Sequence, residues 1–102
     1  MPVVFRVIFT QAARLELIEA QDWYEGEAPG LGRRFRAAID TMAERMSTNP
    51  RQFPLVFKTV RRALLRRFPY ALFFVIDGDD LFVIACFHAS RDPAQWQKRA
   101  GS

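Results

Sequence analysis

The spacing of apolar residues predicts one strand and two helices in the first half of the chain. Residues 3–9 are rich in Val, Ile and Phe and are interrupted only by Arg6, a pattern that favours a strand. Thr10 is a suitable helix N-cap. An apolar stripe of Ala13, Leu17, Ala20 and Tyr24 then predicts a helix to about residue 27. A second stripe predicts a helix from about residue 31 to residue 49: Leu31, Phe35, Ala38 or Ile39, Met42 and Met46. The short loop between them predicts an antiparallel helical hairpin.

The second half of the chain has a pattern that predicts three strands and a short tail. Residues 60–67, 70–76 and 81–87 lack a helical stripe and are mostly aromatic or β-branched. The Asp-Gly-Asp-Asp sequence at 77–80 predicts a tight hairpin turn. Asp92-Pro93 favours a short C-terminal helix. The order β-α-α-β-β-β predicts an α+β fold, with an N-terminal helix hairpin packed on a mainly antiparallel four-stranded sheet.

Length and composition predict one domain over residues 1–100, with residues 101–102 as a cloning remnant. The longest apolar run, residues 68–76, is too short to span a membrane, because a helix needs about 20 apolar residues for that. The N-terminus lacks the basic region of a secretory signal, and the single cysteine, Cys86, cannot form an internal disulfide. We therefore expect a cytoplasmic protein.

Charge is unevenly distributed along the chain. The net charge is +4. No acidic residue lies between Glu44 and Asp77, whereas seven basic residues do: Arg45, Arg51, Lys58, Arg61, Arg62, Arg66 and Arg67. Arginine pairs with phosphates and carboxylates through two parallel hydrogen bonds. This segment therefore favours an acidic partner, either nucleic acid or an acidic protein segment.

Short motifs along nearly the whole chain resemble those of a known family. They are DWYE at 22–25, PGLGxxF at 29–35, NP at 49–50, FP at 53–54, RRAL at 61–64, RFPY at 67–70 and HxxRDPxxW at 88–96. In this order, and with this succession of elements, they resemble the ParE/RelE superfamily of bacterial toxins from type II toxin–antitoxin systems. The ParE-like plasmid stabilisation branch is the most similar.

The resemblance implies a toxin that a cognate ParD-like antitoxin neutralises by wrapping its C-terminal segment around it. Members that resemble ParE inhibit DNA gyrase, and members that resemble RelE cut mRNA in the ribosome. We expect gyrase poisoning without catalysis. A ribosome-dependent endoribonuclease, and a degenerate toxin that only binds its antitoxin, remain the alternatives.

Ribonuclease chemistry needs a base, a cation near the phosphate and an acid for the leaving oxygen. The candidates for such a site are Arg61, Arg67, Tyr70, His88 and Arg91. RelE-like nucleases use several lysines, or a Glu paired with a terminal His. Here Lys58 is the only lysine in the region, and the basic segment contains no carboxylate to pair with His88. This absence favours the non-enzymatic interpretation.

The residues expected to bind the antitoxin or the target are basic or aromatic: Arg51, Lys58, Arg61, Arg62, Arg66, Arg67, His88, Arg91 and Trp96. Strand alternation places Arg61 and Arg67 on one face of the sheet and Arg62 and Arg66 on the other. The tail from His88 to Trp96 resembles the segment implicated in toxicity. In the alternative structural reading, His88 hydrogen-bonds the turn and Trp96 packs on the sheet.

Neither a metal nor a cofactor is expected. One Cys and one His cannot supply the usual nitrogen and sulfur ligands of a closed metal site. Gly30 and Gly32 lie between two predicted helices and do not follow a strand, so they do not form a dinucleotide-binding loop.

The strand at 70–76 is apolar on both sides. This pattern predicts that one side of the sheet meets the helices and that the other side meets a partner.

Overall fold

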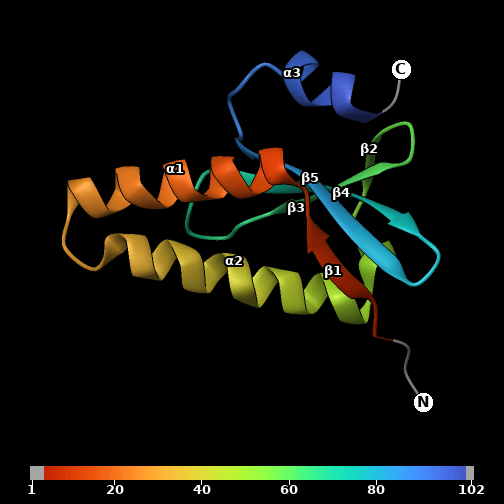
Figure 1. Ribbon diagram of the computed structural model, residues 1–102, viewed down its shortest axis with the longest axis horizontal. Helices are drawn as coiled ribbons and strands as arrows, with labels where there is room; N and C mark the ends of the chain where they lie inside the picture. The colour runs from red at the N-terminus through yellow and green to blue at the C-terminus, as the bar shows by residue number, and fades with distance from the viewer. Residues whose placement is uncertain (1–3, 101–102) are drawn as a thin grey trace.

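The computed structural model describes residues 4–100, so residue 3 and the suspected remnant at 101–102 lie outside the described part. The elements follow in this order: β1 (Arg6–Phe9), α1 (Gln11–Glu27), α2 (Leu31–Thr48), the 3-10 turn η1 (Pro50–Gln52), β2 (Leu55–Phe57), β3 (Val60–Leu64), β4 (Tyr70–Asp77), β5 (Asp80–His88), α3 (Ala94–Gln97) and the 3-10 turn η2 (Lys98–Ala100). The α+β class and the helical hairpin are confirmed (Figure 1).

Local hydrogen bonds explain where the two long helices begin. The Thr10 hydroxyl accepts a hydrogen bond from the Ala13 amide at 3.2 Å, so Thr10 is the N-cap of α1 as predicted. At the start of α2, the Glu25 carboxylate accepts hydrogen bonds from the Gly30 and Gly32 amides, each at 2.9 Å. These bonds lower the pKa of Glu25 and satisfy amides that the helix leaves unpaired.

The sheet has five strands instead of the four predicted, in the order β1-β5-β4-β3-β2. β1 runs parallel to β5, and the other neighbouring pairs are antiparallel. The missed strand is β2, an edge strand of three residues enclosed by Pro54 and by Lys58, which has a φ of 52°. So short a segment shows too little alternation to be recognised in a sequence.

The boundaries of β4 and β5 agree with the prediction to within one residue. β1 begins only at Arg6, although the prediction included residues 4 and 5, and the other difference is at β3. This strand ends at Leu64 and not at residue 67, because the Leu65 amide donates to the Tyr70 carbonyl at 2.9 Å and closes a loop. The loop leaves Arg66 and Arg67 exposed. The turn at 77–80 is confirmed: Asp77 pairs with Asp80, and Gly78 has a φ of 62°.

Different parts of the chain cover the two faces of the sheet (Figure 1). Helices α1 and α2 bury one face with residues such as Leu17 and Phe35, which pack near Phe74. On the other face, the Trp96 ring of α3 stacks on Phe73 with 4.2 Å between ring centroids. We expected a partner on that face, but the chain's own tail covers it around Phe73. The structural reading of Trp96 is therefore confirmed.

Candidate functional site

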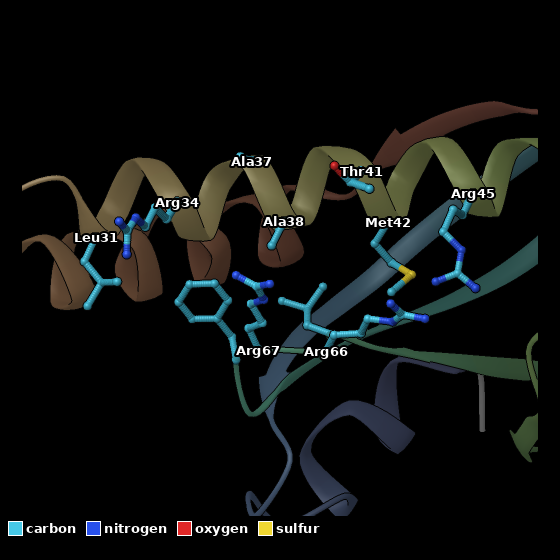
Figure 2. Close-up of a pocket in the computed structure, with 11 residues that line it drawn as sticks. Leu31, Arg34, Ala37, Ala38, Thr41, Met42, Arg45, Arg66 and Arg67 are labelled. Carbon is cyan, nitrogen blue, oxygen red and sulfur yellow. The ribbon is translucent and has the colours of Figure 1, made fainter.

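A basic groove lies between α2 and the loop that joins β3 to β4 (Figure 2). Its volume is about 710 Å³. Apolar side chains and four arginines line it, and none of the 11 lining residues is acidic: Leu31, Arg34, Ala37, Ala38, Thr41, Met42, Arg45, Leu65, Arg66, Arg67 and Phe68. An apolar floor with a basic rim suits an amphipathic segment that carries carboxylates.

The arginines reach into the basic groove from both of its walls (Figure 2). Arg45 extends from α2 toward the loop, and Arg66 extends from the loop toward the same end of the groove. Arg67 rises from the loop toward α2. Side chains that approach from two sides can hold an anionic ligand between them.

Arg61 has a different role from Arg66 and Arg67. It is half-buried, and its Nη1 donates to the Phe53 carbonyl at 2.7 Å and to the Arg51 carbonyl at 3.4 Å. These bonds hold the segment that leads into β2. Arg61 pairs with Phe74 of the core beneath the helices, whereas Arg62 pairs with Phe73 of the other core, so these two lie on opposite faces as predicted. Arg66 and Arg67 lie beyond the end of β3, where the predicted alternation no longer applies.

Of the nine residues expected to bind a partner, only Arg66 and Arg67 line the basic groove. Arg51, Lys58 and Arg62 are exposed on η1, on the β2–β3 turn and on β3. The Lys58 ammonium lies 5.2 Å from the centre of the Phe57 ring. Trp96 is only 4% exposed, so its ring serves the packing of the tail and offers little surface.

A second cavity, which we call the α1–β5 pocket, has a volume of about 460 Å³. It lies between α1 and the residues at the end of β5, with one residue from the start of β4: Glu16, Glu19, Ala20, Trp23, Tyr70, Cys86, His88, Ser90 and Arg91. Three of the five nuclease candidates meet here, and the Tyr70 and His88 rings lie 5.3 Å apart. The other two, Arg61 and Arg67, do not line this pocket.

A hydrogen bond selects the tautomer of His88, and burial shifts the pKa of Tyr70 and of Cys86. The Ser90 amide donates to Nδ1 of His88 at 3.1 Å, so the proton of the neutral imidazole is on Nε2. Burial, helped by Cys86 and Glu19, raises the pKa of Tyr70, so its phenol remains a donor at neutral pH. Burial also raises the pKa of the Cys86 thiol to about 12, which makes the thiol unreactive.

The carboxylates of the α1–β5 pocket come from α1, which lies outside the basic segment in which a carboxylate partner for His88 was expected. Oε2 of Glu16 lies 2.7 Å from Nη2 of Arg99, and its Oε1 accepts from the Cys86 amide at 3.1 Å. Glu19 is exposed at the same pocket. The signal was present in the sequence, because Glu16, Glu19 and Trp23 are spaced three and four residues apart and so share one helix face.

Residues 4–100 contain neither a cluster of metal ligands nor a membrane-spanning helix. In this range, no group of three or more His, Cys, Asp or Glu side chains is arranged to hold a metal ion. None of the helices in the described part of the chain has the length and apolar character needed to cross a membrane.

Other proteins of known structure share this fold. Solved structures that resemble this one include the chromosomal ParDE toxin–antitoxin system from P. aeruginosa, with a TM-score of 0.74, 18% identity and coverage of 83% of this chain and 96% of that one. The RelBE2 toxin–antitoxin complex from Mycobacterium tuberculosis matches with a TM-score of 0.60, 22% identity and coverage of 86% and 94%. No curated protein matches. Residues 7–93 match the family described as ParE toxin of type II toxin-antitoxin system, parDE, and the chain therefore belongs to this toxin family.

Proposed function

We propose that this toxin arrests growth in the cytoplasm by binding and poisoning DNA gyrase, not by cutting RNA. The observation that supports this most is the dispersal of the nuclease candidates. Arg61 is bound to backbone carbonyls and Arg67 lines the basic groove, whereas Tyr70, His88 and Arg91 line the α1–β5 pocket. Nuclease catalysis needs its cation, base and acid around one phosphate. Tyr70, His88 and Arg91 share one pocket, but the two arginines of the basic segment do not join them, and this separation favours a toxin that acts by binding.

We assign the antitoxin to the basic groove. An acidic segment of a ParD-like antitoxin would place apolar side chains on the groove floor near Met42 and carboxylates against Arg45, Arg66 and Arg67. Charge-assisted hydrogen bonds between arginine and carboxylate are among the strongest in proteins. Exposed basic residues on other elements would contribute where the antitoxin wraps beyond the groove.

Inducing the chain alone in growing cells tests the target. We expect growth arrest with a DNA damage response and continuing early translation, because gyrase poisoning leaves broken DNA. His88→Ala should retain most of the arrest, since the proposed mechanism needs no acid or base. Immediate loss of translation with mRNA cut at ribosomes, abolished by a folded His88→Ala variant, would contradict the proposal. A folded protein that causes no arrest would leave only antitoxin binding.

Charge reversal in the basic groove tests the antitoxin site. Arg66→Glu with Arg67→Glu should weaken antitoxin binding by at least about 100-fold by calorimetry, since each lost charge-assisted hydrogen bond removes about 1.5–3 kcal/mol. The matched control is Arg14→Glu with Arg33→Glu, which makes the same change of charge at exposed positions outside the groove. An equal loss in both double variants would show that only overall charge matters, and would refute the site.

A further inference from the structure

The α1–β5 pocket carries an aromatic side chain that the fold does not use. Trp23 is 59% exposed, although the next residue, Tyr24, is buried. The two rings pack edge to face with 5.0 Å between centroids, so the indole has a fixed support. Large, rigid and exposed aromatic rings are typical of binding surfaces.

Three hydrogen-bond donors border the same pocket. Nε2 of His88 carries a proton because Ser90 holds Nδ1, and the Tyr70 phenol remains protonated. The Arg91 guanidinium stacks on the Phe87 ring at 4.4 Å. Among the hydrogen bonds of residues 4–100, none uses the Arg91 side chain. Donors of this kind suit the oxygens of a phosphate.

The two carboxylates of the pocket are not equivalent. Glu16 is paired with Arg99 and with the Cys86 amide. Glu19 has no such partner among the described interactions, and it precedes Trp23 by one helical turn. A carboxylate beside a stacking ring can accept hydrogen bonds from the amino and imino groups of a base. The volume of about 460 Å³ falls within the range of small-ligand sites.

We propose that the α1–β5 pocket binds one nucleotide of a single-stranded nucleic acid. The base stacks on Trp23 and hydrogen-bonds to Glu19, and the phosphate is held by His88 and Arg91. Aromatic stacking beside cationic phosphate contacts is how proteins hold unpaired nucleotides. This binding site goes beyond the proposed function, which concerns gyrase and the antitoxin. DNA and RNA share the chemistry, and the experiment separates them.

Fluorescence anisotropy with the full chain, purified free of antitoxin, tests this site. The probes are labelled DNA and RNA decamers of one unpaired sequence, at two salt concentrations. Trp23→Ala should weaken binding about 10-fold, since stacking of one base contributes about 1–3 kcal/mol. The control is Leu15→Ala, which truncates another exposed α1 side chain that does not line the pocket. Arg91→Ala should weaken binding more than the charge-matched Arg14→Ala.

Intrinsic fluorescence gives a second readout. Trp23 is exposed and Trp96 is buried, so oligonucleotide should quench emission in the wild type and not in Trp23→Ala. Tighter binding of RNA would show that the 2′-hydroxyl is read, and equal binding would show that the base and phosphate suffice; both support the site. Cleavage of the bound RNA would contradict the gyrase proposal and leave this one intact.

Two results would overturn the nucleotide site. The first is oligonucleotide binding that Trp23→Ala and Arg91→Ala leave unchanged. The second is growth arrest that Trp23→Ala abolishes although the wild type binds neither decamer. In the second case the pocket would contact a protein instead.

Discussion

The turn between the two long helices requires glycine at two positions. Gly30 has a φ of 86°, a conformation that favours glycine. Gly32 is required for a different reason, because a Cβ atom there would lie 2.7 Å from the Gln21 carbonyl oxygen and 2.9 Å from Oε1 of Glu25. The sequence predicts the hairpin but not this close approach, which depends on how tightly α1 and α2 pack.

Alanine at two glycines tests this packing. Gly32→Ala should lower the free energy of unfolding by about 1–3 kcal/mol, because the added methyl group forces the helices apart and disturbs the Glu25 cap. Gly26→Ala is the matched control, because no atom lies within 4 Å of a Cβ added at this position. Alanine there should raise the free energy of unfolding by up to about 1 kcal/mol. Urea unfolding measures both. Equal midpoints for the two variants would show that the turn is not tightly packed.

Site residues were predictable where a motif marked them and were missed where only the fold brings them together. The sequence predicts one site of Arg61, Arg67, Tyr70, His88 and Arg91; the last three meet in the α1–β5 pocket, and the first two do not line it. Glu19 and Trp23 are not predictable in this way, because they lie on α1, far in the sequence from the basic second half of the chain. Nothing in a sequence states which face of α1 the end of β5 approaches.

At the scale of elements, the tail depends on its anchors. α3 and η2 have four and three residues, too few to be stable helices on their own. Trp96 packs on Phe73, and Arg99 joins Glu16 on α1 and the Ile84 carbonyl on β5. The tail therefore ties α1 to the sheet beside the α1–β5 pocket.

A double-mutant cycle tests the anchor. Truncating Arg99 and Glu16 to alanine, singly and together, should give a coupling energy of about 1 kcal/mol or more, because the Glu16 side chain is only 14% exposed. The control is the pair of Arg6 and Asp80, whose arginine side chain is 74% exposed and whose coupling should be weaker and more sensitive to salt. Thermal unfolding of the wild type and the six variants gives both values. Equal coupling in the two pairs would show that the tail is not held in this way.

Strand boundaries were the least predictable part of the fold. Alternation correctly assigned Arg61 and Arg62 to opposite faces, because their partners Phe74 and Phe73 belong to different cores. It could not predict the end of β3 at Leu64, which depends on a backbone hydrogen bond from Leu65. Backbone pairing, which the pattern of side chains does not reveal, sets such limits.

At the scale of the whole molecule, the two candidate surfaces are chemically distinct. The basic groove uses α2 and the β3–β4 loop and contains no carboxylate among its lining residues, whereas the α1–β5 pocket combines carboxylates with donors. The two share no lining residue. An antitoxin segment in the groove therefore leaves the pocket side chains uncovered unless the antitoxin wraps further around the toxin.

The most direct test of the central claim uses purified DNA gyrase and plasmid DNA with the full-length toxin. We expect the toxin to block supercoiling and to accumulate cleaved plasmid, His88→Ala to act like the wild type, and added cognate antitoxin to restore supercoiling. Normal supercoiling at an excess of folded toxin, with cleavage of ribosome-bound mRNA by the same preparation, would contradict the claim and identify a ribonuclease.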